Sequence, residues 1–214
     1  MSKYLRQTSR LTTWITDEIQ ESLAVKSKLA RCADQIAEAG SSIVTRLRAG
    51  GKLIAFGNGG SAADAQHIAA EFVGRYQAKR KALAAIALTT DSSCLTAIGN
   101  DFGFEEIFSR QLEAIGKPDD VAFAISTSGN SKNVLRAITS AKKLGMATIG
   151  LSGRSGGELC DTVDLCLCVP SDVTPRIQEA HLLIIHILCG IVENAVVDTG
   201  RTSGAMQADV IPGG

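Results

Sequence analysis

The sequence predicts a three-layer α/β sandwich around a central, mostly parallel sheet of about five strands. Five short apolar runs follow one another along the chain, and most of them are separated by stretches with helical periodicity. Each run is apolar almost throughout. The alternation indicates a parallel sheet with crossover helices, and the continuous apolarity indicates strands covered on both faces. The 214 residues, 45% of them apolar, are enough for one domain with its own core.

The elements can be placed in order along the chain. Between Leu23 and Leu47 apolar residues recur every three or four positions, which predicts helices before the first strand. Strands are expected in the runs KLIAFG, AAIAL, VAFAIS, ATIGLS and LCLCVP, and the main crossover helices at 62–76, 104–115 and 132–144. A long apolar helix beginning at Pro175 closes the domain, because the first helical turn tolerates proline's missing N–H.

These elements make residues 1–197 a single domain with an N-terminal helical arm. The tail, 198–214, reads DTGRTSGAMQADVIPGG and is expected to be mobile, because it is small, polar and glycine-rich. The segment before Leu23 carries no pattern that predicts a role.

Charge and cysteine usage narrow the classes of partner. The 22 basic and 22 acidic side chains cancel, which argues against nucleic acid and anionic membranes and favours a small molecule. The six cysteines include no CxxC pair and lie mostly in apolar runs, so we expect buried, reduced thiols. The N-terminus does not resemble a signal peptide, and the run HLLIIHILCGIV is expected to be too short and too polar to cross a bilayer. The chain is therefore expected to be cytoplasmic.

A glycine-rich loop follows the first expected strand. Residues Gly57, Asn58, Gly59, Gly60 and Ser61 let bare backbone approach a phosphate or sugar hydroxyl, at the positive end of the next helix. The alternative is a tight turn in which Ser61 caps that helix. The relaxed dinucleotide fingerprint G-x-G-x-x-G/A also fits, but the acidic residue expected about twenty positions later is missing.

A second polar loop strengthens the phosphate interpretation. Another expected strand ends in Ser126, Thr127, Ser128, Gly129, Asn130 and Ser131, at the start of a helix. One helix cap needs one residue, and the surplus of hydroxyl donors suits the oxygens of a phosphate. Both loops should lie at the carboxyl ends of their strands, where open α/β sheets bind ligands.

His67 and Glu71 stand four residues apart, on one face of the helix after the glycine loop. A surface ion pair is the ordinary explanation of such a pair. Beside a bound sugar phosphate, the carboxylate could instead act as a general base, and the two groups could hold a divalent metal. The closing helix adds Gln178, Glu179, His181 and His186 as candidates, of which not all can have a functional role.

Taken together, these blocks resemble the phosphoheptose isomerases of the sugar-isomerase (SIS) domain superfamily, over Leu23 to Val197. The similarity lies in GNGGSAADAQHIAAEF, ALTTDSSCLTAIGNDFGFEEIFSRQ, STSGNS and TPRIQEAHLLIIHILCGIVE, in the family's order and spacing. It implies a flavodoxin-like SIS domain that interconverts sedoheptulose 7-phosphate and D-glycero-D-manno-heptose 7-phosphate through an enediol, the entry to ADP-heptose and lipopolysaccharide. It also implies a homotetramer with active sites between subunits.

The resemblance assigns roles to individual positions. Glu71 would be the catalytic base and His186 its acid/base partner. Zinc would be held by His67, Glu71, Gln178 and His186. The substrate would be bound by the sugar-binding positions Asn58, Gly59, Gly60, Ser61, Glu71, Asn100, Asp101 and Gln178, and by the phosphate-binding positions Ser126, Thr127, Ser128 and Ser131.

One feature of the closing helix bears on assembly. Gln178 and His186 are eight residues apart, so about 12 Å of helical rise separates them, which is hard for one metal to span. We therefore expect composite sites, in which His186 and Glu71 come from different subunits.

The alternative function is that of a non-catalytic SIS-domain adaptor, which binds a replication initiator protein or senses phosphosugars.

Overall fold

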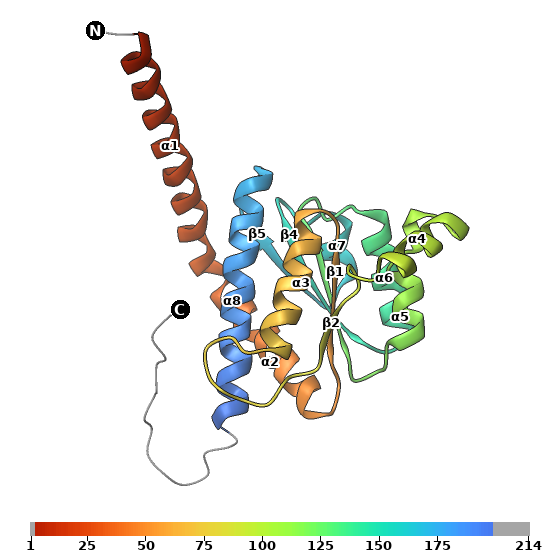
Figure 1. Cartoon of the computed structure of the whole chain (residues 1–214). Helices are drawn as coiled ribbons and strands as arrows, with labels where there is room; N and C mark the ends of the chain where they lie inside the picture. Colours follow the sequence, from red (N-terminus) through yellow and green to blue (C-terminus); the bar gives the residue numbers. More distant parts are fainter. Residues whose placement is uncertain (1–2, 199–214) are drawn as a thin grey trace.

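The computed structural model describes residues 3–198 and confirms the predicted fold class. At its centre is one sheet of five parallel strands in the order β2-β1-β3-β4-β5 (Figure 1). Each strand lies within one of the five predicted apolar runs, except that β4 extends one residue beyond its run, to Gly153. The strands are β1 (Leu53–Gly57), β2 (Ala85–Ala87), β3 (Val121–Ser126), β4 (Ala147–Gly153) and β5 (Leu165–Val169).

Helices cover both faces of the sheet, as the continuous apolarity of the strands predicts. On one face, α2 (Ala33–Arg48), α3 (Gly60–Val73) and α8 (Thr174–Asp198) pack against residues such as Ala55 and Phe123. On the other face, α5 (Ser109–Ile115), α6 (Lys132–Lys143) and α7 (Gly157–Thr162) pack against residues such as Phe56 and Ala124. Since successive strand residues point to opposite faces, the central strands are buried on both sides.

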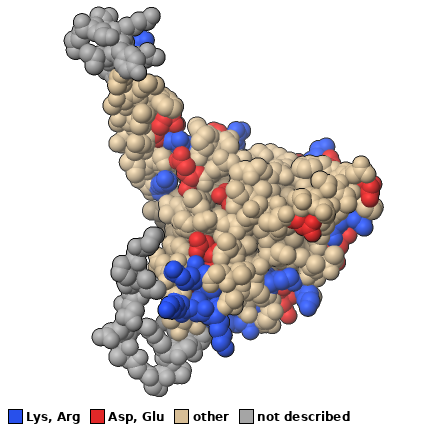
Figure 2. Space-filling view, viewed as in Figure 1, with Lys and Arg blue, Asp and Glu red and all other residues tan. Residues whose placement is uncertain are grey.

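The N-terminal helices begin earlier than the sequence pattern predicts. Helix α1 (Lys3–Lys28) is followed by a 3-10 turn, η1 (Leu29–Cys32), and it extends away from the domain (Figure 1). Its base is held by the buried Arg176 at the start of α8, which pairs with Glu18 of α1 and with Glu179. Figure 2 shows acidic side chains where α1 meets the domain and both signs of charge over this face, consistent with the balanced composition.

Two predicted helices differ in detail. The segment predicted as one helix, 104–115, is broken into a 3-10 turn, η2 (Phe104–Glu106), and α5, because the buried Ile107 and Phe108 turn into the core between them. Helix α4 (Ser92–Asp101), capped by the carboxylate of Asp91, precedes them. The tail beyond Asp198 lies outside the described residues, so its predicted mobility stays a prediction.

The prediction of six reduced core cysteines is wrong. Cys160 of α7 and Cys166 of β5 form a disulfide, and among the free cysteines only Cys189 is fully buried. The position of the cysteines in apolar runs suggested burial, but β5 is an edge strand whose cysteines are only partly covered.

The run HLLIIHILCGIV, which we expected to be too short and too polar to cross a membrane, is part of a longer helix. Residues Thr174–Val197 are long and apolar enough to do so, because the helix extends beyond the run that we considered. In the folded chain, 44% of its most apolar window is buried, and α8 packs against α2 and α3.

Candidate active site

The glycine loop after β1 brings the backbone close to α8. Gly59 has a positive φ of 55°, which favours glycine, and it lies at the N-terminal end of α3. A Cβ on Gly60 would overlap the side-chain amide of Gln178, so that amide lies directly over the start of α3. Ser61 is buried and makes no capping bond, so the alternative in which it caps the helix is wrong. The structure therefore brings together two parts of the predicted sugar-binding set, the glycine loop and Gln178.

Asn58 is held by a partner that the sequence analysis missed. Its amide exchanges two hydrogen bonds with the amide of Asn133: Asn58 Nδ2 donates to Asn133 Oδ1 at 2.8 Å, and Asn133 Nδ2 donates back at 2.9 Å. Asn133 is buried at the start of α6. This pair ties the glycine loop to the serine loop, which precedes the same helix.

The serine loop 126–131 lies at the end of β3, next to β1 in the sheet. The hydroxyls of Ser126 and Ser131 are 3.0 Å apart, Thr127 and Ser131 are half-buried, and Ser128 is exposed. Asn130 is already engaged, because its Oδ1 accepts a hydrogen bond from the N–H of Glu158 in α7. The hydroxyls of the predicted phosphate set thus lie together at the carboxyl end of β3, where Ser126 and Ser131 bond to each other and Ser128 Oγ accepts from the N–H of Asn130.

His181 has a structural environment beneath this loop. It is fully buried, and its Nε2 lies 3.1 Å from the carbonyl oxygen of Ser152, whose hydroxyl donates to the carbonyl of Ser126. Burial lowers the pKa of His181 to about 4, opposed only in part by the bond to Ser152. Glu179 is likewise engaged, with Ser22 and Arg176. Neither residue faces the ligand loops as a free group.

The burial of His181 predicts a pH dependence of stability. Because its folded pKa is lowered from 6.5 to about 4, its contribution is complete above pH 6.5 and is lost as pH falls toward 4. Between pH 7 and 5 the free energy of unfolding should fall by roughly 2 kcal/mol through this group. Urea unfolding of the wild type and of His181→Gln at the two pH values measures the difference. Identical pH slopes in both chains would contradict the assignment.

A second group of side chains lies along the contact between α3 and α8. His67 Nε2 is 2.9 Å from His186 Nε2 and 3.5 Å from Glu71 Oε1. Potential ligand atoms of all three residues lie within 4.8 Å of one another, and all three side chains are half-buried. Two imidazoles and a carboxylate are a common zinc ligand set, and partial exposure leaves an open position. We refer to His67, Glu71 and His186, the candidate catalytic residues, as the catalytic trio.

The loop after α3 supports the trio. Tyr76 stacks on His186, with ring centroids 5.7 Å apart, and the N–H of Tyr76 donates to Glu193 of α8. Arg80 pairs with Glu193 at 3.0 Å and also donates to the backbone carbonyl of Glu71. Burial alone would raise the pKa of Glu193, but the N–H groups of Ala78, Gln77 and Tyr76, together with Arg80, lower it below its usual value.

Asp64 lies one turn before His67 and was also missed. Burial raises its pKa to about 6, opposed by the nearby His67, and its Oδ2 is buried without a hydrogen-bond partner among the described residues. No sequence signal distinguishes it from an ordinary helical aspartate. Asn133, Tyr76, Arg80 and Glu193 were missed for the same reason, because their roles depend on contacts distant in the sequence.

The structure corrects the expected division of the site. Glu71 and His186 meet within one chain, so the expectation that they come from different subunits is wrong. That expectation was based on the spacing of residues along α8 and did not consider which side of α8 faces α3. Gln178 lies instead against Gly60, at the start of α3. Gly60 is seven residues, or about 10 Å of helical rise, before His67. Asn100 and Asp101 are exposed at the end of α4 and bond to each other.

Comparisons with known proteins agree with the predicted family and fold. Residues 17–153 match the SIS domain family. A phosphoheptose isomerase of Roseiflexus sp. is 53% identical over 188 residues, which cover 87% of this chain and 95% of that protein. The chain belongs to the phosphoheptose isomerase family. A second family member, from Rhodospirillum rubrum, is 55% identical over 79% of this chain and 90% of its own length.

A solved structure shows the same fold within this isomerase family. The phosphoheptose isomerase of Neisseria gonorrhoeae superposes with a TM-score of 0.82 at 43% sequence identity, covering 86% of this chain and 99% of that one.

Proposed function

We propose that this chain interconverts sedoheptulose 7-phosphate and D-glycero-D-manno-heptose 7-phosphate, as the first step toward ADP-heptose and lipopolysaccharide. The observation that carries the proposal is the catalytic trio, which places a carboxylate and two imidazoles together in a chain whose relatives are named phosphoheptose isomerases. We place the reaction in the cytoplasm, where soluble biosynthetic enzymes of this kind act.

Aldose–ketose exchange requires removal of a proton next to a carbonyl and its return one carbon away, through an enediol. Glu71 takes that proton and gives it back. His186 moves protons at the two sugar oxygens, and Tyr76 and His67 hold its ring in place. Stacking and hydrogen bonding fix the ring orientation, so little reorganisation is needed at the moment of proton transfer.

The phosphate would bind in the serine loop, through the hydroxyls of Thr127, Ser128 and Ser131 with Ser126 behind them. Asn58, Gly59, Gly60 and Gln178 lie beside this loop and would hold the sugar chain. Binding energy from the remote phosphate orients the reacting carbons, so losses in this loop should reduce turnover as well as affinity.

Zinc fits the catalytic trio, because His67, Glu71 and His186 offer one oxygen and two nitrogen ligands within 4.8 Å of one another. When bound, it would polarise the sugar oxygens and favour the enediolate. A fourth ligand from Gln178 of the same chain would have to cross about 12 Å of helical rise. We therefore propose that Gln178 reaches the trio from a second subunit.

We propose that the chain forms a homotetramer, because this division of the site requires more than one subunit. The glycine loop, the serine loop and Gln178 lie together at the carboxyl edge of the sheet, which we call the sugar-binding end. The trio lies about two helical turns away along α3 and α8. A complete site therefore combines the sugar-binding end of one subunit with the trio of another, and Asn100 and Asp101 are free to contribute to a neighbouring site. The exposed apolar side chains of α1, Leu11, Trp14, Ile15, Ile19 and Leu23, provide a surface for such association.

An adaptor or sensor function is the alternative within the same fold. A binding module has no need for a half-buried base beside two imidazoles, so the trio favours the enzyme. The test is to follow sedoheptulose 7-phosphate consumption with zinc present and to determine the configuration of the product. Absence of turnover with seven-carbon and six-carbon phosphosugars would overturn the proposal.

The double variant Ser128→Ala with Ser131→Ala should weaken substrate binding and lower kcat without unfolding the chain. Each lost hydroxyl donor should cost on the order of 1 kcal/mol of binding, or about fivefold in KM. Thr139→Ala, whose hydroxyl bonds within α6, is the matched control. Steady-state kinetics measure the effect, and unchanged constants in the double variant would remove the phosphate assignment.

A further inference from the structure

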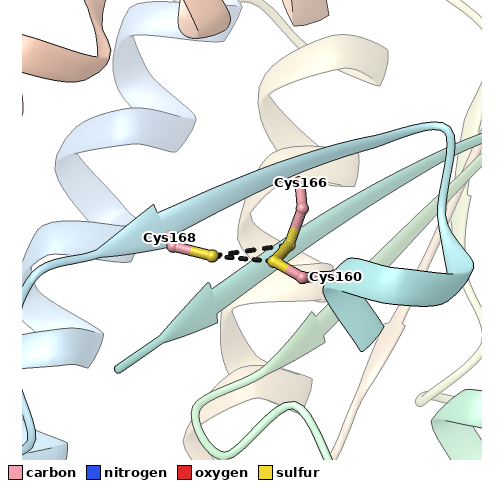
Figure 3. Close-up of side chains that lie close together, drawn as sticks. All are labelled: Cys160, Cys166 and Cys168. Carbon is pink, nitrogen blue, oxygen red and sulfur yellow. Dashed lines mark hydrogen bonds between the residues drawn. A yellow bond between two sulfur atoms is a disulfide. The ribbon is translucent and has the colours of Figure 1, made fainter. Parts of the chain in front are cut away.

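Three cysteines lie together next to the serine loop. The disulfide joins Cys160 to Cys166, and the free Sγ of Cys168 is 2.8 Å from Cys160 Sγ and 3.6 Å from Cys166 Sγ (Figure 3). All three residues are half-buried, so a small reagent can reach them. A free thiol in contact with a disulfide places the attacking sulfur of a thiol–disulfide exchange within reach, and a rotation of the Cys168 side chain would bring it in line with the Cys160–Cys166 bond.

This cluster is linked physically to the phosphate-binding loop. Cys160 belongs to α7, and the preceding residue, Leu159, donates its N–H to the carbonyl of Gly129 at 2.9 Å. A Cβ on Gly156 would overlap Cys160 Sγ, and a Cβ on Gly129 would overlap the carbonyl of Gly156. The cysteine sulfurs, Gly156 and the serine loop therefore form one continuous packed path.

We propose that Cys160, Cys166 and Cys168 form a thiol–disulfide exchange site that controls substrate binding at the serine loop, with a low-molecular-weight thiol and its disulfide as the external redox couple. This regulation rests on the proposed function of the loop. In reducing compartments, disulfides are usually transient, catalytic or redox-sensing rather than structural.

The internal step needs no external reagent. Cys168 loses its proton and its Sγ attacks Cys160 Sγ, the nearer of the two sulfurs. A Cys160–Cys168 bond forms, the Cys160–Cys166 bond breaks, and the electron pair leaves on Cys166 Sγ, which takes up the proton. Burial and the neighbouring Cys32 raise the pKa of Cys168, so exchange should accelerate as pH rises.

Complete reduction consumes two equivalents of the external thiol, which leave as one disulfide, while the site gains two thiols, those of Cys160 and Cys166, beside the thiol of Cys168. Reduction and internal exchange both break the Cys160–Cys166 bond. Exchange also moves the point at which Cys160 is bonded to β5 by two residues, or about 7 Å, along the strand. Because Gly156 packs against the sulfurs and against Gly129, either change should displace the serine loop. The oxidised form is the one in which the serine loop has the arrangement described above for the phosphate site, so it should be the tighter-binding state.

Disulfide mapping tests the chemistry without relying on activity. The full chain, Cys166→Ser, Cys168→Ser and the control Cys94→Ser are equilibrated with reduced and oxidised glutathione, alkylated and digested without reduction. Mass spectrometry should find Cys160–Cys168 in Cys166→Ser and only Cys160–Cys166 in Cys168→Ser. Free Cys160 and Cys168 in oxidised Cys166→Ser would overturn the exchange step. Loss of one bound zinc per chain in reduced Cys168→Ser would identify a metal site and would also overturn it.

Kinetics under the same redox conditions test the control of binding. Reduction should raise KM for sedoheptulose 7-phosphate about fivefold in wild type and Cys94→Ser, with no effect on the Cys160→Ser variant. Equal KM in both redox states would overturn the regulation and leave the isomerase intact. Absence of turnover in both states would overturn the proposed function, while disulfide mapping still decides the exchange chemistry.

Discussion

Glu71→Gln is expected to lower kcat for isomerisation about 10³-fold or more, because the amide cannot take the proton from the carbon next to the carbonyl. The fold should survive, since the Glu71 side chain is half-buried and its packing is nearly unchanged by the substitution. Proton exchange with solvent deuterium at the second carbon of the substrate, followed by NMR, measures the step directly.

A matched control separates the basicity of Glu71 from general effects of lost charge. Glu38→Gln removes an exposed carboxylate from α2 and should leave the kinetics unchanged. Zinc content is measured in both variants, because Glu71 would also contribute a ligand. Full retention of deuterium exchange in Glu71→Gln would show that another group is the base.

Arg80→Met should have the largest effect on stability. The side chains of Arg80 and Glu193 are each only 4% exposed, so the substitution leaves a buried carboxylate without its cation. Removing one member of a buried ion pair typically costs about 3–5 kcal/mol of unfolding free energy. The variant should also lose activity, because Arg80 orders the loop that holds Tyr76 against His186.

Urea unfolding at neutral pH measures this loss, with Arg75→Met as the control on the exposed surface of the same loop. The double variant Arg80→Met with Glu193→Gln should regain part of the stability, since it no longer buries an unpaired charge. A loss below about 1 kcal/mol in Arg80→Met would contradict the structural role of the pair.

The sheet and its ligand loops could be predicted because their signals are local. Each strand is a short apolar run, and the glycine and serine loops end two of these runs, so the parallel topology alone brings them to one edge. The break between η2 and α5 was not predictable, because it depends on where the buried Ile107 and Phe108 meet the core.

The arrangement of the catalytic trio could not be predicted from spacing. His67 and His186 are 119 residues apart, and their contact depends on the rotation and axial offset of α3 against α8. Sequence spacing indicated that Gln178 and His186 are hard for one metal to span, but not which of them meets Glu71. The disulfide was missed for a similar reason, because α7 and an edge strand bring Cys160 and Cys166 together only in the fold.

The central claim is that one active site combines the trio of one subunit with the sugar-binding end of another, and mixed assemblies test it most directly. Glu71→Gln, His186→Ala and Gln178→Ala are prepared separately, shown to be inactive, and co-refolded in equal amounts by pairs, with subunit exchange verified by mass spectrometry. Glu71→Gln with Gln178→Ala should regain activity, because random assembly leaves about one site in four with an intact trio and an intact Gln178.

The pair Glu71→Gln with His186→Ala is the internal control. Since these residues lie in one chain, every trio in that mixture carries a defect, and activity should stay at the level of the single variants. Recovery approaching a quarter of wild type in the first mixture and none in the second is the predicted result. Recovery with Glu71→Gln and His186→Ala, or none with Glu71→Gln and Gln178→Ala, would contradict the composite site.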